Sequence, residues 1–70
     1  MYLTRDEAIA KLEATYGSDA NAAGMLDSAP QYPHHTRTNF YLITRYPAGP
    51  VWRDGKIVGQ HPDMWTVSNW

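Results

Sequence analysis

The chain has 70 residues, no cysteine and a formal net charge of −1. This length allows one domain at most, spanning residues 1–70, and the lack of cysteine excludes disulfides and cysteine-based zinc sites. The near-neutral charge excludes a global field that would attract nucleic acid or a membrane, and the chain has no signal-like or membrane-spanning apolar run. We therefore expect a complete, soluble cytoplasmic protein with no membrane contact.

Residues 4–28 predict a helical hairpin. Thr4 and Glu7 match a capping box, which predicts a first helix over residues 5–16. Apolar side chains recur on one stripe of that helix, and Gly17 is placed to end it.

A second, shorter helix follows, for which Ser18 or Asp19 is the expected N-cap. Gly24 in its middle costs about 1 kcal/mol relative to alanine. We therefore expect packing to hold this glycine, with a close approach to the first helix. Pro30 ends the second helix.

Residues 29–37 predict an extended connector. Pro30 and Pro33 push the residues before them out of the helical region of backbone space. Ordered connections of this length are more often functional than short ones.

Residues 38–70 predict a β-meander. The stretch 39–46 is rich in aromatic and β-branched residues, as in a strand, and neither of its faces is purely polar. We expect the helices to cover the face of Phe40 and Leu42, which leaves Tyr41 and Arg45 on the exposed face.

Asp54-Gly55 predicts a hairpin with a type I′ turn between residues 51 and 58. In the expected register Trp52 faces Ile57 and Val51 faces Val58, and Trp52 lies in the core. A last strand follows over residues 64–69. The predicted fold is α+β, with an N-terminal helical hairpin packed on one face of a small three- to four-stranded antiparallel sheet.

The histidines do not form a recognisable metal motif. His34 and His35 are adjacent, so in an extended segment their side chains point in opposite directions. A metal site would need one of them together with His61 and a carboxylate from Asp63 or Asp54. We expect solvent-facing histidines, and neither a metal nor any other cofactor.

Catalytic residues are not indicated either. Asp6 and Glu7 are explained by helix capping and Asp54 by its turn. The glycines form no phosphate-binding pattern, and so short a chain has little room for a deep pocket. We expect no enzyme, and a small metal-dependent enzyme stays as the least favoured alternative.

Aromatic and basic residues gather in the second half of the chain. Seven of the nine aromatic residues follow Pro30, and four of the six Lys and Arg lie there too. Aromatic and Arg side chains dominate binding hot spots. About half of the aromatics, Trp52 and Trp65 among them, are needed for the core of so small a domain. The candidate partner-binding residues are Tyr32, His34, His35, Arg37, Tyr41, Arg45, Trp65 and Trp70.

The expected function is binding without catalysis. We predict a small protein that occupies a surface of a larger protein, by analogy of size with phage or mobile-element inhibitors of bacterial host or defence proteins. A homodimer through an edge strand or the aromatic face is a further expected mode. The main alternative is a module that stacks single-stranded nucleic acid on its aromatic side chains. Protein is favoured over nucleic acid because the basic residues are few and dispersed.

Overall fold

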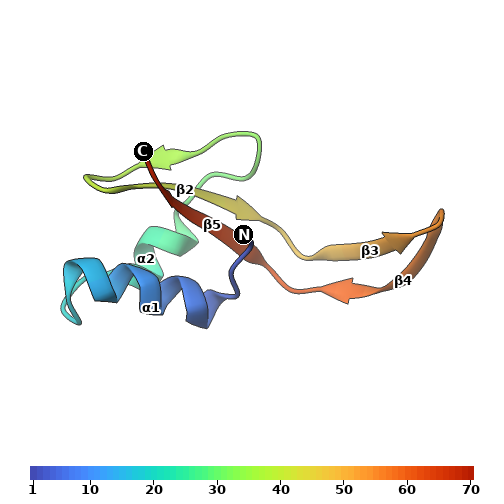
Figure 1. The fold of residues 1–70 in the computed structure, drawn as a ribbon, viewed down its shortest axis with the longest axis horizontal. Coiled ribbons are helices and arrows are strands. Elements are labelled where there is room, and N and C mark those ends of the chain that lie inside the picture. Colours follow the sequence, from blue (N-terminus) through green and yellow to red (C-terminus); the bar gives the residue numbers. More distant parts are fainter.

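The computed structural model describes residues 1–70 as two helices and five strands (Figure 1). The helices pack against one face of an antiparallel sheet, so the predicted α+β class is confirmed. The elements are α1 (Arg5–Tyr16), α2 (Ala22–Asp27), β1 (Thr36–Arg37), β2 (Tyr41–Tyr46), β3 (Gly49–Arg53), β4 (Lys56–His61) and β5 (Met64–Asn69).

Helix α1 begins at the predicted capping box. The Thr4 hydroxyl oxygen accepts a hydrogen bond from the Glu7 amide at 3.3 Å, and the Glu7 carboxylate accepts one from the Thr4 amide at 2.9 Å. The Thr4 amide, and after it the Thr4 hydroxyl, favour the charged carboxylate, so they hold the pKa of Glu7 below its ordinary value of 4.5. The helix ends at Gly17, whose φ of 90° is a conformation that favours glycine.

Helix α2 begins later than predicted. Its N-cap is Asn21 rather than Ser18 or Asp19, and the Asn21 side-chain oxygen accepts a hydrogen bond from the Gly24 amide at 3.1 Å. A Cβ atom at residue 24 would lie 2.2 Å from the Asn21 side chain. Gly24 therefore makes room for the cap, and α2 also contacts α1.

The three-stranded sheet has β2 at its centre, between β1 and β5. Thr36 pairs with Ile43 and Ile43 with Val67. The connector predicted over residues 29–37 is thus partly a strand, and Gln31 adds a bridge to Arg45. These backbone pairings tie the connector to the sheet.

The strand order differs from the predicted meander. β2 pairs with β5, and β3 pairs only with β4, so the two pairs form one long hairpin that is interrupted halfway (Figure 1). Pro47-Ala48 interrupts the hairpin between β2 and β3, and Pro62-Asp63 interrupts it between β4 and β5. The Ala48 amide donates to the Asp63 carboxylate across it at 2.7 Å, which closes the ribbon there.

The core lies between the helices and the three-stranded sheet. Trp65 is 2% exposed, and its indole N–H donates to the Leu26 carbonyl oxygen at 2.9 Å. This bond ties β5 to α2. The buried apolar residues are Leu3, Ala8, Leu12, Ala22, Leu26, Ala29, Tyr41, Ile43, Trp65 and Val67.

The predicted faces of β2 are reversed. Tyr41 and Ile43 are buried under the helices, whereas Phe40 is 53% exposed and lies before the strand begins. The Tyr41 hydroxyl forms a hydrogen bond with the Thr15 hydroxyl of α1. Because apolar residues occupy both faces of this strand, alternation alone could not decide which face is covered.

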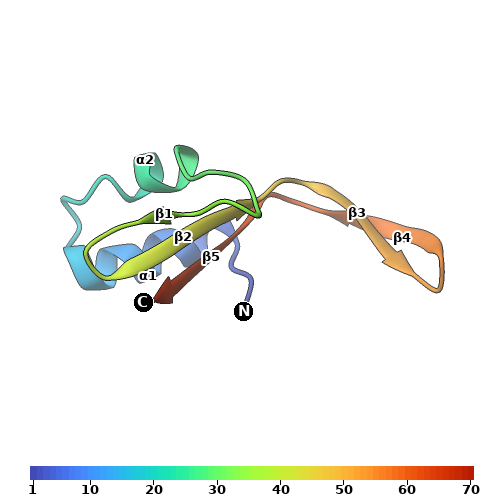
Figure 2. The same cartoon turned by 90° about the horizontal axis from the view of Figure 1, so that it is seen from above.

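Residues 49–61, called the arm below, project from the rest of the molecule (Figures 1 and 2). The molecule measures 42 × 21 × 18 Å, and its radius of gyration is 13.1 Å. A compact chain of this length would have a radius of gyration of roughly 11 Å. Trp52 is 62% exposed on the arm, so its predicted place in the core is wrong.

The turn of the arm is the predicted one, but the register slips beyond it. Asp54 and Gly55 have φ angles of 52° and 77°, as a type I′ turn requires. Trp52 pairs with Ile57 as expected, whereas Val51 pairs with Gly59 rather than Val58. An irregularity between Val51 and Trp52 causes the shift, since two residues of β4 there oppose one of β3.

Candidate functional site

Two of the eight predicted contact residues are buried, and a third is only partly exposed. Tyr41 and Trp65 are 7% and 2% exposed and belong to the core, so they are not available as partner contacts in the folded chain. Arg45 is half-buried, and its Nε atom has no hydrogen-bond partner. The expected exposure of Tyr41 is wrong because the helices were assigned to the wrong face of β2, and the same assignment overstated the exposure of Arg45.

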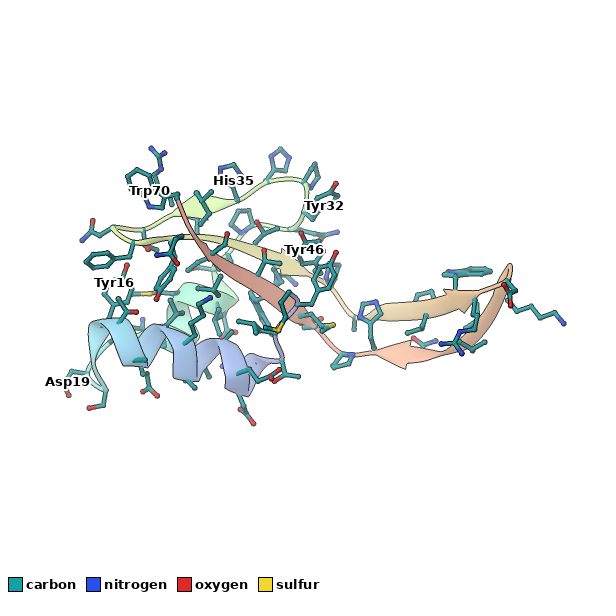
Figure 3. The ribbon with its side chains drawn as sticks, viewed as in Figure 1. Tyr16, Asp19, Tyr32, His35, Tyr46 and Trp70 are labelled. Carbon is teal, nitrogen blue, oxygen red and sulfur yellow. The ribbon has the colours of Figure 1, made fainter.

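The other five predicted residues are exposed, and four of them come from the connector. They are called the connector face below and are Tyr32, His34, His35, Arg37 and Trp70. Trp70, His35 and Tyr32 follow one another along one edge of the molecule, above β2 in the view of Figure 3. The pairing of β1 with β2 brings the connector to this edge, and the end of β5 brings Trp70 there.

Trp70 is held in place although it is the last residue. Its indole N–H donates to the Thr38 carbonyl oxygen at 2.9 Å. The Arg37 guanidinium lies over the indole ring, with its central carbon 3.8 Å from the ring centroid. This contact is a cation–π interaction. The Trp70 side chain is nevertheless 58% exposed, so a large aromatic surface is fixed and accessible together.

Tyr32 is fixed by a stack of tyrosine rings. It is 61% exposed and stacks on Tyr46 with a centroid distance of 5.3 Å, and Tyr46 meets Tyr2 edge-on at 4.9 Å. The Tyr32 amide donates to the Arg45 carbonyl oxygen at 2.9 Å, next to the cis Tyr32–Pro33 peptide bond. The connector face therefore has an ordered aromatic side chain near each end.

A hollow lies beside this stack, where the arm joins the sheet. It has a volume of about 350 Å³ and is lined by Tyr2, Tyr46, Val51, His61 and Met64. Apolar side chains make up most of its wall. The hollow extends the aromatic surface from Tyr32 toward the arm.

The titratable side chains do not assemble a metal centre. No group of three or more His, Asp or Glu side chains lies close enough to hold a metal ion. His34 and His35 are exposed on the connector, and the His61 ring lies 2.9 Å from the Pro62 carbonyl oxygen at the base of the arm. The histidines thus lie in two separate regions of the surface.

The basic residues of the second half are dispersed. Arg37 belongs to the connector face, Arg53 and Lys56 flank the turn at the tip of the arm, and Arg45 is half-buried at the end of β2. A nucleic-acid strand is bound along a continuous basic groove. These four side chains do not line one.

Sequence reasoning missed the exposed apolar residues of the arm. Trp52, Ile57 and Val58 are 62%, 55% and 57% exposed, and Val51 is 39% exposed. Four such side chains on one hairpin make a second candidate contact surface. Pro47 and Pro62 flank this hairpin and Pro50 lies within β3; these prolines were the available signal that the ribbon leaves the core there.

The chain matches no known protein family, no curated protein and no solved structure. Neither helix combines the length and apolar character that crossing a membrane requires. The candidate site therefore rests on the geometry of the connector face and of the arm.

Proposed function

We propose that the protein is a non-enzymatic binding protein that occupies a surface of a larger protein through its connector face. The observation that carries the proposal is the ordered but exposed pair of Arg37 and Trp70. Side chains that are fixed before binding lose little conformational entropy when a partner covers them. Trp and Arg are also the residue types most enriched in binding hot spots.

The chemistry of the face suggests the chemistry of the partner. Arg37 gives the face a positive charge, and His34 and His35 add two exposed imidazole rings. Trp70 and Tyr32 present flat apolar rings at its ends. A complementary surface would offer carboxylates to Arg37 and an apolar recess to the indole.

Protein is favoured over single-stranded nucleic acid by the dispersal of the basic residues. Only Arg37 among the four lies on the connector face. One face of the Trp70 ring is already covered by the Arg37 guanidinium, which leaves one ring face for stacking. The further prediction that the partner is a bacterial host or defence protein rests on size alone and stays a prediction.

The chain offers matched variants for testing this surface. Trp70 and Trp52 are 58% and 62% exposed, one on the connector face and one on the arm. Immobilised wild-type protein, Trp70→Ala and Trp52→Ala would each be used to retain partners from a lysate of the organism that encodes the chain. Arg37→Ala and Arg53→Ala form a second matched pair.

The proposal expects a partner that is retained by the wild type and by both arm variants. Trp70→Ala and Arg37→Ala should each weaken that binding by about 2 kcal/mol or more, as hot-spot truncations do. Equal retention by Trp70→Ala and the wild type would refute the assignment of the face. Binding of a single-stranded oligonucleotide that weakens steeply with salt would favour the nucleic-acid alternative.

A further inference from the structure

The outer edge of β4 is open for backbone pairing. The strand has six residues, contains no proline, and carries its one Lys at the end next to the turn. Natural proteins protect edge strands with prolines, charges, bulges, short strands or a covering segment. In β4 no proline or charge lies between Lys56 and His61, and every residue before His61 is exposed. Its one protecting feature is the irregularity at Val58, which has no partner in β3.

The other outer strands are protected. β3 contains Pro50, which lacks a backbone N–H, and β1 has only two residues. The edge of β5 is covered where Leu3 and Trp65 exchange two backbone hydrogen bonds of 2.8 and 2.9 Å. β4 is therefore the least protected edge strand for pairing with a further strand.

The arm also has too few strands to be stable by itself. A two-stranded hairpin is marginal in water, and three or more strands with an apolar face are needed for independent stability. No residue of the arm is buried, although Trp52, Ile57 and Val58 are large and apolar. Additional strands would give these side chains neighbours.

We propose that β4 pairs antiparallel with β4 of a second copy of this chain, which makes a four-stranded sheet with a two-fold axis near Val58. This dimer goes beyond the proposed function and leaves the connector face free. In this register Lys56 lies opposite Gln60 of the second copy, so the two lysines stand at opposite ends. Like charges directly opposite each other, which would weaken the pairing, are avoided.

Charge complementarity supports a second copy as the occupant. The tip of the arm carries Arg53 and Lys56 against Asp54. A hollow of about 570 Å³ at the base of the arm is lined by three acids, Asp6, Asp27 and Asp63, with Arg5 as its one basic residue. Antiparallel pairing of two arms brings the basic tip of each copy toward the acidic hollow of the other.

A specific dimer of this chain would bury a sizeable share of its surface. A stable interface buries about 800 Å² on each partner. The chain exposes 4877 Å² in total, so such an interface would take roughly a sixth of its surface. Because of the two-fold symmetry each contact between a tip and a hollow forms twice, and each copy contributes one strand edge.

The absence of cysteine makes single cysteines clean probes of this contact. Val58→Cys places a thiol near the proposed axis, where opposed residues of antiparallel strands have Cα atoms about 4.5–5.5 Å apart, as a disulfide needs. Val51→Cys is the matched control on β3. Under mild oxidation we expect Val58→Cys to form a disulfide-linked dimer at least about tenfold faster than Val51→Cys.

Sedimentation of the unmodified chain is the independent measurement. We expect a monomer–dimer equilibrium that shifts toward monomer at high salt, because salt screens the tip and the hollow. Val58→Lys should shift the equilibrium toward monomer, since it places two lysines opposite each other. A wild-type chain that stays monomeric up to about 1 mM, or equal cross-linking of the two cysteine variants, would overturn the proposal.

Discussion

Removing the arm should leave the fold of the helices and the three-stranded sheet intact. Tyr46 and Met64 are paired residues, so a two-residue Asn-Gly turn can join them directly in place of residues 47–63. The replaced segment supplies no residue to the core. The interactions lost are the ladder within the arm, which is marginal by itself, and the wall of the hollow beside Tyr46.

The expected change in the free energy of unfolding is small, and the variant can be slightly more stable than the wild type. Shortening the connection from 17 residues to two lowers the entropy cost of closing it by roughly 2 kcal/mol on the logarithmic loop estimate. Loss of contacts around Tyr46 opposes this gain. We therefore expect the variant to unfold within about 2 kcal/mol of the wild type, on either side.

Urea denaturation followed by tryptophan fluorescence measures this difference. Because the arm is exposed in the folded state, its removal should change the dependence of the unfolding free energy on urea only slightly. Near-ultraviolet circular dichroism should retain the signal of buried Trp65. A loss of more than about 3 kcal/mol, comparable to removing a large core side chain, would refute the claim that the arm lies outside the core.

Three further substitutions test the helices and the three-stranded sheet. Trp65→Phe removes a buried indole N–H donor and should lower the free energy of unfolding by about 1–3 kcal/mol, whereas Trp52→Phe should change it by less than about 0.5 kcal/mol; equal effects in urea denaturation would contradict the assigned burial. Glu7→Gln should be less stable than the wild type above pH 4.5, and the difference should shrink as the pH falls through the lowered pKa of Glu7; a difference that does not vary with pH would contradict the capping role. Gly24→Ala should bring little net stability, because a gain in helix propensity of about 1 kcal/mol is offset by loss of the Asn21 cap, and the same change in an Asn21→Gly background should recover most of the gain.

Local signals in the sequence were sufficient for the elements that depend on neighbouring residues. The capping box at Thr4 and Glu7 and the Asp54-Gly55 turn are formed by residues close in sequence, and both appear as predicted. These features need no information about distant contacts.

Long-range arrangement could not be predicted in the same way. The buried face of β2 depends on which side the helices cover, and both sides offered apolar residues. The pairing of β2 with β5 rather than β3 depends on the break at Pro47 and Pro62, which the sequence indicates only as two separate loops. The exposed position of Trp52 follows from that pairing, so the sequence placed it in the core and missed the arm as a surface.

Residue type alone indicated part of the candidate site, whose contact with a partner stays a prediction. Tyr32, Arg37 and Trp70 are residues that suit a contact surface, and they are exposed. That Arg37 stacks on Trp70 could not be foreseen, because it requires the end of β5 to lie beside β1. Tyr41 was a wrong choice for the same reason that the face of β2 was wrong.

The chain has three tryptophans, and each lies in a different region of the structure. Trp65 is in the core, Trp70 on the connector face and Trp52 on the arm. Fluorine NMR of protein labelled with 5-fluorotryptophan, recorded during titration with the partner identified by retention, reads all three at once. We predict that the Trp70 signal shifts while the Trp65 and Trp52 signals stay in place. A shift of Trp52 or Trp65 with an unchanged Trp70 signal would contradict the claim that the connector face is the binding surface.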